Sequence, residues 1–332
     1  MTDAPVTTIS VEEFSERAQA IVNEVRKVIV GQTELIRHVL ICVVVGRHAL
    51  LEGVPGLGKT MLIRTLSEVM NLKFSRIQFT PDLMPADITG TNIMEKQGDG
   101  RQEFRFEAGP IFANLVLADE INRATPKTQS ALLEAMQEKM VTVANTTYHL
   151  DPPFFVLATQ NPLEMEGTYP LPEAQLDRFM FKIHVPFPST QELVEIFNRT
   201  TGGDEGQPQP VVDGAQILAM SELAYQVPIA SHVSEYVARL VVATHPESEG
   251  ATDKVRRYVR YGSSPRGGQA LILGAKVNAL LEGRYNVAFD DVKLIAPAVF
   301  RHRLLLNFEG LAEGITADDV ISELIEQTPT GA

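Results

Sequence analysis

The amino-acid sequence predicts an α/β fold: an αβα domain built on a parallel sheet, followed by an all-helical lid domain. Three observations support this prediction. In the first 185 residues, short apolar runs typical of buried strands alternate with stretches of helical periodicity. A glycine-rich loop of the phosphate-binding type joins the first of these runs to a helix. Beyond residue 185 the helical spacing continues, with no convincing strand.

The composition is that of a globular, folded protein. The chain has 332 residues, 44% hydrophobic and 21% charged, and at about 150 residues per domain it fits two domains. A formal net charge of −13 counts against broad binding to nucleic acid or anionic membranes. The single cysteine, Cys42, stands in an apolar run, which indicates a buried thiol in a reducing compartment. A polar start and a short longest apolar run, residues 39–45, predict a cytoplasmic protein without signal peptide or membrane span.

The expected elements follow one another as an α/β domain requires. Ser10 and Glu13 stand at capping-box spacing before a helical pattern, so a helix opens the chain after residues 1–10, which we expect to be flexible. Further helices are predicted at residues 60–70 and 125–139. The apolar runs predicted to be strands are 48–51, 74–79, 115–118, 154–158 and 181–185.

A change in sequence character after residue 185 marks the boundary between the domains. Two prolines follow, and residues 201–210 are rich in glycine, proline and polar side chains, which is typical of an exposed loop. We therefore expect an αβα domain over residues 1–200, a linker at 201–212 and a helical domain over 213–332. Helical spacing in the last part predicts helices at 215–225, 233–244, 266–281 and 289–300.

Residues 53–60 fit the phosphate-loop pattern G-x-x-x-x-G-K-[ST], and a predicted strand and a predicted helix flank them as that motif requires. In such a loop, glycines let backbone N–H groups close on phosphate oxygens. Lys59 would bring positive charge toward the β and γ phosphates, and the Thr60 hydroxyl could bind Mg²⁺. The residues expected to contact the nucleotide here are Gly53, Val54, Pro55, Gly56, Leu57, Gly58, Lys59, Thr60 and Met61.

Polar side chains end two further predicted strands. Asp119 and Glu120 follow the run 115–118, and ligands of open α/β sheets bind beyond the carboxyl ends of strands. We expect Asp119 to hold Mg²⁺ and Glu120 to polarise an attacking water, which favours hydrolysis. Asn161 follows the run 154–158 and would contact that water or the γ-phosphate. The alternatives are a solvated acidic turn for the pair and a plain turn former for Asn161.

Two hairpins are predicted as inserts in the αβα domain. Residues 92–106 read as one hairpin around Gly98-Asp99-Gly100, and residues 140–150 as another, around Asn145-Thr146-Thr147. Either could grip a partner, or both could be plain surface hairpins. The first carries charges of both signs, so it offers no basic stripe for DNA.

With these elements in order, the chain resembles the AAA+ ATPases and, in detail, the MoxR family. The resemblance spans roughly residues 30 to 303. Besides the phosphate loop it is carried by VGQ (30–32), TPDLMPADITG (80–90), ADEINRA (118–124), QSALLEAMQE (129–138), EGTYPLPEAQLDRF (166–179) and SPRG (264–267).

The resemblance implies rings, usually hexamers, that bind ATP between subunits, and it suggests roles for particular residues. Val30, Gly31 and Gln32 match the segment that lines the adenine pocket. Asn161 matches the polar sensor 1 residue and Arg266 the sensor 2 arginine of the lid. Arg178 matches the arginine presented to the neighbour's γ-phosphate, with Arg123 a second candidate for the interface. The alternative for Arg178, which follows Asp177, is a local ion pair. The hairpin at 92–106 matches the helix 2 insert, which commonly faces the pore.

The leading hypothesis is a Mg²⁺-dependent ATP hydrolase that moves its lid against the αβα domain and so remodels or matures a protein partner. The resemblance implies chaperone roles in assembly or metal-cofactor insertion, often with a von Willebrand A domain protein, which would here be a separate chain. One alternative is a nucleotide-gated binding scaffold with little hydrolysis. Another is a nucleic-acid motor or loader, which the net charge disfavours.

Overall fold

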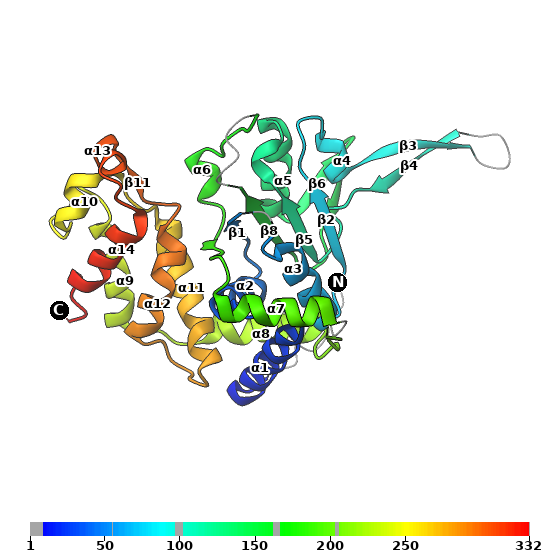
Figure 1. Ribbon diagram of the computed structural model, residues 1–332. Helices are drawn as coiled ribbons and strands as arrows, with labels where there is room; N and C mark the ends of the chain where they lie inside the picture. The colour runs from blue at the N-terminus through cyan, green and yellow to red at the C-terminus, as the bar shows by residue number, and fades with distance from the viewer. Residues whose placement is uncertain (1–8, 55, 97–101, 162–166, 203–205, 332) are drawn as a thin grey trace.

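The computed structural model describes residues 9–54, 56–96, 102–161, 167–202 and 206–331. A five-stranded sheet with helices on both faces forms one part of the molecule (Figure 1). The C-terminal helices stand beside it, and a long hairpin projects from the opposite side (Figure 1). The predicted fold class, an αβα domain with a helical lid, is confirmed.

The central sheet is parallel and has the strand order β2-β5-β8-β1-β9. Each of the apolar runs predicted to be a strand forms one of its members. The strands are β1 (Ala49–Glu52), β2 (Phe74–Gln78), β5 (Leu115–Asp119), β8 (Phe155–Gln160) and β9 (Phe181–His184). Gln78 pairs with Asp119, and Glu52 with Gln160, so the carboxyl ends of these strands meet at one edge.

Helices cover both faces of the sheet because successive strand residues point to opposite sides. Leu115 and Leu117 belong to the core under α1 (Val11–Val28) and α3 (Lys59–Val69), whereas Val116 and Ala118 belong to the core under α5 (Pro126–Glu138). The predicted capping box is present: the Glu13 N–H donates to Ser10 Oγ (3.1 Å), and the Ser10 N–H donates to Glu13 Oε2 (2.9 Å). The helices of this part are α1 (Val11–Val28), α2 (Thr33–Val44), α3 (Lys59–Val69), α4 (Pro85–Thr89), the 3₁₀ helix η1 (Ile121–Arg123), α5 (Pro126–Glu138) and α6 (Glu173–Leu176).

Both predicted hairpins are present. The longer one pairs β3 (Gly90–Lys96) with β4 (Gln102–Ala108), and its predicted turn at 98–100 lies outside the described residues. The shorter one pairs β6 (Met140–Val143) with β7 (Thr146–His149). Its turn is wrongly predicted at 145–147: it is formed by Ala144 (φ 46°) and Asn145 (φ 68°), and the β-branched Thr146 already pairs in the strand.

The connection to the C-terminal helices lies along the αβα part. Helix α7 (Thr190–Gly202) extends into the range predicted as a linker, 201–212. Residues 206–212 of this range are also described, and there the Gln209 N–H donates to Glu24 Oε2 of α1 (2.9 Å). The Val211 N–H donates to the carbonyl of Val69 (2.9 Å), and Val212 is buried. These residues therefore follow the surface of α1 and α3 closely.

The C-terminal part is built from helices at all four predicted places. The sequence did not indicate the short antiparallel pair β10 (Val259–Tyr261) and β11 (Leu305–Leu306), because two or three residues are too few to show a strand period. The helices are α8 (Gly214–Gln226), α9 (Ser231–Ala243), α10 (Asp253–Tyr258), α11 (Pro265–Leu281), α12 (Phe289–Phe300), α13 (Phe308–Ala312) and α14 (Ala317–Gln327).

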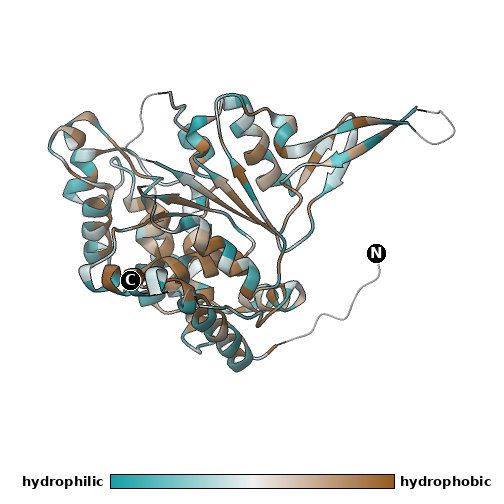
Figure 2. Cartoon of the chain, turned by 45° about the vertical axis from the view of Figure 1, so that its right-hand side comes forward, coloured by the Kyte–Doolittle hydropathy of each residue, from teal (hydrophilic) through white to brown (hydrophobic). Residues whose placement is uncertain are grey.

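One apolar core joins the two parts of the chain. It runs from α1, α2, α3 and one face of the sheet into α8, α9, α11, α12 and α14. Figure 2 shows apolar residues along the central strands and on helices of both parts. Gly274 of α11 lies at a close contact: a Cβ there would lie 3.0 Å from Phe181 Cζ of β9 and 2.8 Å from Ile295 Cγ2 of α12. The lid and the sheet are thus packed together by the side chains of one continuous core.

Candidate active site

The phosphate loop ends on the first turn of a helix. Gly58 caps α3, and both Gly56 (φ 85°) and Gly58 (φ 74°) adopt the left-handed conformation that glycine adopts without strain. Gly53 is required by space instead, because a Cβ there would lie 3.0 Å from Val185 Cβ. The first N–H groups of α3 have no partner within the helix and can bind phosphate oxygens. Pro55 lies outside the described residues.

A cavity of about 540 Å³ opens at this helix start, on the carboxyl edge of the sheet. It brings together residues predicted from separate motifs: Lys59, Thr60, Asp119, Glu120 and Asn161. Partial burial lowers the pKa of Lys59, although the nearby carboxylates of Asp119 and Glu120 act in the opposite direction. Its other lining residues are Gly56, Leu57, Gly58, Met61, Arg64, Arg76, Gln78 and Thr159.

The acidic pair is held in a network of hydrogen bonds. Asp119 Oδ1 accepts from the Thr159 hydroxyl (2.6 Å), and Asp119 Oδ2 accepts from Arg76 Nη2 (2.6 Å). Glu120 turns into the left-handed region (φ 57°), and its Oε2 accepts from Gln78 Nε2 (2.8 Å) and Arg123 Nη1 (3.0 Å). Arg123, a candidate for contact with a neighbour, therefore pairs with a carboxylate of its own chain.

Sequence reasoning missed three members of this network: Arg76, Gln78 and Thr159. The Thr159 hydroxyl also accepts from the Glu120 N–H (2.9 Å), so it connects both acidic residues. The signal that could have found them is position, because each lies at or near the carboxyl end of a strand that neighbours β5. Polar residues at such places face the same ligand.

The cavity offers the kind of ligands that Mg²⁺ takes. The Thr60 hydroxyl and the Asp119 carboxylate both line it, and Mg²⁺ in nucleotide sites is held by one or two such oxygens together with phosphates and water. These residues fit a magnesium ion shared with a nucleotide.

The segment predicted to line an adenine pocket lies beside the phosphate loop. Gln32 adopts a left-handed conformation (φ 50°) before α2, and its Nε2 donates to the carbonyl of Leu57 (3.3 Å). Gly31 (φ 65°) stands against α7, since a Cβ there would overlap the carboxylate of Glu192. Val30 precedes them and is half-buried. The geometry brings this segment and α7 to one side of the loop.

Glu52 anchors the strand that leads into the loop. Its carboxylate accepts from Lys182 Nζ (2.8 Å) and lies 3.0 Å from His184 Nε2, both on β9. Burial alone would raise the pKa of Glu52, but the hydrogen bonds and charges of His184 and Lys182 outweigh it and lower this pKa to about 2. The carboxyl end of β1 is therefore fixed beside Gly53.

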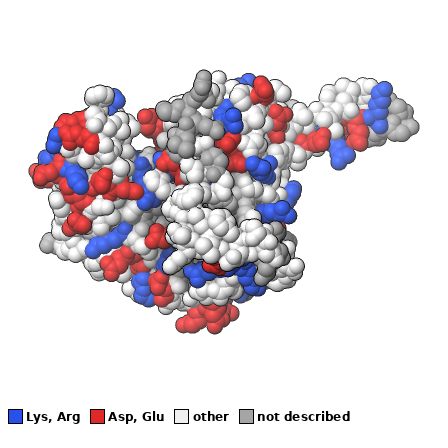
Figure 3. All heavy atoms as spheres, viewed as in Figure 1, with Lys and Arg blue, Asp and Glu red and all other residues white. Residues whose placement is uncertain are grey.

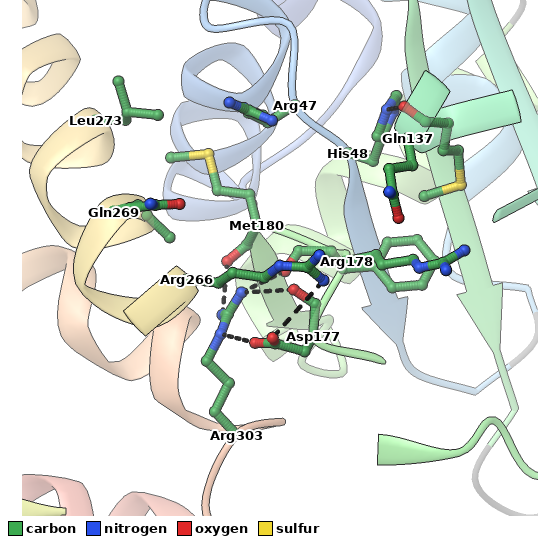
Figure 4. A pocket seen from close by; sticks show the side chains of 13 residues that line it. Arg47, His48, Gln137, Asp177, Arg178, Met180, Arg266, Gln269, Leu273 and Arg303 are labelled. Atoms are coloured by element: carbon green, nitrogen blue, oxygen red, sulfur yellow. Dashed lines mark hydrogen bonds and ion pairs between the residues drawn. The ribbon is translucent and has the colours of Figure 1, made fainter. Parts of the chain in front are cut away.

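Arg178 and Arg266 lie elsewhere, in a second cavity of about 140 Å³ between the sheet and the lid (Figure 4). Arg266, at the start of α11, is half-exposed, and its Nη1 lies 3.9 Å from Asp177 Oδ2. Arg47, from the turn before β1, lines the same cavity. None of these arginines lines the phosphate-loop cavity, so within one chain Arg178 and Arg266 lie apart from the phosphate loop and the acidic pair.

Within the described ranges, no helix is long and apolar enough to cross a membrane.

Two family models match the chain. Residues 48–181 match the ATPase family associated with various cellular activities (AAA), and residues 252–324 match the AAA lid domain. The first match covers the phosphate loop, the acidic pair and Arg178, and the second covers Arg266 and α12. The fold and the site thus define an AAA ATPase with its lid.

Relatives narrow this class. Chaperone MoxR1 of Mycobacterium tuberculosis is 45% identical over 91% of this chain and 79% of its own length. YeaC of Bacillus subtilis, which is uncharacterised, is 42% identical over 92% of each chain, and Protein MoxR of Methylorubrum extorquens is 31% identical over 89% of each. A crystal structure from Cytophaga hutchinsonii, described as a candidate ATPase, is 42% identical and covers 96% of both chains with a TM-score of 0.90. The chain belongs to the MoxR family of AAA+ ATPases.

Proposed function

We propose that this protein hydrolyses ATP with Mg²⁺ in a ring of identical subunits, and that hydrolysis drives the remodelling or maturation of a separate protein client. The observation that carries the proposal is the division of the site. The phosphate loop and the acidic pair line one cavity, whereas Arg178 and Arg266 line another. A head-to-tail interface would join the first cavity of one subunit to the second cavity of the next.

In this proposal, residues of the phosphate-loop cavity bind and orient the reactants. The N–H groups at the start of α3 and the ammonium of Lys59 bind phosphate oxygens. Thr60 and Asp119 hold Mg²⁺, which supplies Lewis-acid stabilisation of the phosphates when bound. Glu120 accepts a proton from the attacking water, and Asn161 helps to position that water.

Glu120 must exchange partners before it can act as a base. Its Oε2 accepts from Gln78 and Arg123. In this arrangement the carboxylate is paired with the Arg123 guanidinium and turned toward β2 and η1. Binding of a nucleotide beside Lys59 would have to draw Glu120 away from these donors. The same observation favours, as a second candidate, a nucleotide-gated scaffold in which Glu120 stays paired and hydrolysis is negligible.

The neighbouring subunit would supply the charges that stabilise the transferring phosphoryl group. An arginine delivered in this way is worth about 10³ to 10⁵ in rate in related GTPases. Arg266 and Arg178 lie on one cavity and could reach the same phosphate together. Activity would then depend on assembly, and the resemblance to hexameric rings gives the expected size.

An uncharged patch supports self-association. Phe187, Val194 and Phe197 are exposed on and just before α7, and Figure 3 shows an uncharged area over this helix. No residue of α7 is buried within the described part of the chain. Exposed apolar patches of this kind mark interaction surfaces. Because Glu192 of the same helix contacts Gly31, the patch borders the nucleotide site, where a second copy must approach.

The long hairpin is the proposed contact for a client. Met94 and Phe104 pair across it, and their side chains are 56% and 70% exposed. At its base, Phe106 stacks on Tyr148 of the second hairpin with ring centroids 3.9 Å apart, which stiffens the projection. The chaperone name of one relative supports a protein client. Charges of both signs along the hairpin favour a protein over nucleic acid (Figure 3).

The motion that reaches the client would occur between subunits. The lid shares one core with the sheet of its own chain, so the two parts resist independent movement. A change at the nucleotide would therefore shift one whole subunit against the next, through the arginines that touch it.

The test is ATP hydrolysis per chain, measured with Mg²⁺ across a wide range of protein concentration. Wild-type specific activity should rise with assembly, and Arg178→Ala should abolish this rise while still binding ATP. Glu120→Gln should bind ATP and assemble but not hydrolyse it. A rate independent of concentration would refute the shared site. A rate near zero at every concentration, with normal assembly, would favour the scaffold.

A further inference from the structure

A single buried side chain of the lid holds the backbone that carries Arg178. Arg303, in the turn after α12, donates from Nε to Asp177 Oδ1 (2.8 Å). Its Nη2 donates to the carbonyl oxygens of Asp177 (3.2 Å) and Phe179 (2.8 Å), and its Nη1 to that of Met180 (3.1 Å). These four hydrogen bonds end on residues 177, 179 and 180, and so hold the chain on both sides of Arg178.

No donor of Arg303 is spare. The second bond of Nη1 goes to the carbonyl of Val299 in α12 (2.6 Å), and an arginine has five N–H donors. The guanidinium is therefore fixed to its own helix and to the 177–180 segment at the same time. Lysine, with one nitrogen and three donors, cannot reproduce this planar fork.

The surroundings make this contact hard to break. The Arg303 side chain is 2% exposed, and Asp177 supplies its counter-charge. Burial lowers the pKa of Arg303 to about 10, which still leaves it charged at neutral pH. The Asp177 carboxylate also accepts from the Ser264 hydroxyl (2.9 Å), and His302 Nε2 lies 3.0 Å from the carbonyl of Phe179. Arg303, Ser264 and His302 all belong to the lid, and on the other side the Met180 N–H donates to the carbonyl of His48 (2.8 Å).

Asp177 also connects the segment that carries Arg178 with the helix that carries Arg266. Ser264 caps α11, the helix that starts with Pro265 and Arg266, so Asp177 contacts the element that carries Arg266 as well as Arg303. Figure 4 shows Asp177 joined by dashed lines to both Arg266 and Arg303. One carboxylate thus links the residues on either side of Arg178 to the helix that starts with Arg266.

We propose that Arg303 is a positioning residue: it fixes the segment that carries Arg178 to the lid, so that Arg178 and Arg266 meet a neighbouring subunit as one rigid unit. This inference rests on the proposed function, in which both arginines act across an interface. All five N–H donors of Arg303 bond within its own chain, so it offers none to a nucleotide. A plain structural brace would instead affect both halves of its own subunit equally.

Mixed rings separate these two roles. The donor subunit carries Glu120→Gln, which removes its own hydrolysis but leaves its arginines. The acceptor subunit carries Arg178→Ala, which leaves its phosphate-loop cavity intact. Mixed at equal amounts, the two should recover hydrolysis at about one in four interfaces by random placement in the ring. Arg303→Lys is then added to either the donor or the acceptor.

Arg303→Lys in the donor should lower the recovered rate about ten- to hundredfold, because a displacement near 1 Å has costs of this order. The KM for ATP should not change, since the acceptor binds the nucleotide. In the acceptor, which already lacks Arg178, the same substitution should change the rate less than about twofold. Arg284→Lys in the donor is the matched control: Arg284 also holds a lid carboxylate, that of Asp291 (2.6 Å), away from residues 177–180.

The outcomes are distinct. Equal losses from donor and acceptor placement, or no loss from the donor, would overturn the positioning role. If the two parent variants recover no hydrolysis when mixed, the proposed shared site fails instead. If Arg303→Lys yields no folded protein by circular dichroism, Asp177→Asn in the donor makes the same test. It weakens the ion pair with Arg303 but keeps the shape of the side chain at position 177. A loss confined to the donor would again support the proposal.

Discussion

Acid should destabilise this protein through buried histidines, and His48 provides the sharpest test. It precedes β1 and is buried; its Nδ1 accepts from the Val156 N–H (3.0 Å), and its Nε2 lies 3.0 Å from the carbonyl oxygen of Met136. A neutral ring with its proton on Nε2 satisfies both partners. A second proton would have to bind Nδ1, where it would point at the Val156 N–H, another donor. Burial, with the charges of Lys139 and Arg47, lowers the pKa of His48 to about 4.

The sign and size of the effect follow from this pKa. In the unfolded chain a histidine titrates near about 6.5. Between that value and about 4, the unfolded chain binds a proton that the folded one does not. Stability is therefore complete above about pH 6.5 and is lost as the pH falls toward 4. At about 1.36 kcal/mol for each pH unit, His48 costs about 2 kcal/mol by pH 5 and about 3 kcal/mol below pH 4.

The perturbation is His48→Gln, with the free energy of unfolding measured in urea from pH 5 to pH 7.5. Glutamine can still donate to Met136 but leaves the Val156 N–H unpaired, at a cost of about 1 to 3 kcal/mol at pH 7. It cannot take up a proton, so near pH 5 the slope of stability against pH should fall by about 1.2 kcal/mol per pH unit. His149→Gln, on the exposed face of β7, is the control. Parallel curves for wild type and His48→Gln would refute the reasoning.

Four further predictions follow from the site and the hairpin. Glu120→Gln should lower hydrolysis about 10² to 10⁴-fold in a phosphate-release assay, with ATP binding retained. Thr159→Val should cost about 1 to 3 kcal/mol of stability in urea unfolding and lower kcat, because Asp119 and the Glu120 N–H lose their shared partner. Glu52→Gln should cost about 2 kcal/mol in urea unfolding at pH 7, and the difference should shrink as the pH falls from about 4.5 toward 2, where the wild-type carboxylate also becomes neutral. Phe104→Ser, at an exposed site, should change the melting temperature and the hydrolysis rate little but abolish client binding in a pull-down.

The sheet and its loop could be predicted from sequence because local patterns determine them. Runs such as 115–118 contain no polar residue that could face solvent, which is typical of a strand buried on both faces. The observed strand extends just one residue further. The phosphate loop depends on glycine conformations and on one lysine that follows directly. Helix α7 was not predicted, and in the structure its apolar residues Val194 and Phe197 are exposed instead of joining the core.

The arrangement of the site could be predicted only in part. Asp119, Glu120 and Asn161 end strands of one parallel sheet, so their meeting follows from topology. The position of Arg266 depends on how the lid packs on α1, α2 and β9, and no local pattern encodes that. Its separation from Lys59 and its place beside Asp177 therefore required the structure. Arg303 carried no motif in the sequence reasoning, and only its burial and its bonds reveal it.

The shared core has a consequence for exchanging parts between relatives. A chimera that joins this αβα domain to another lid would have to match the two surfaces side chain by side chain. At Gly274, even alanine would bring a methyl group within 3.0 Å of Phe181 and 2.8 Å of Ile295. A lid with a larger residue there would need smaller residues at the positions of both Ile295, in the lid, and Phe181, in the strand. A functional exchange should therefore move the lid together with the strand beneath it.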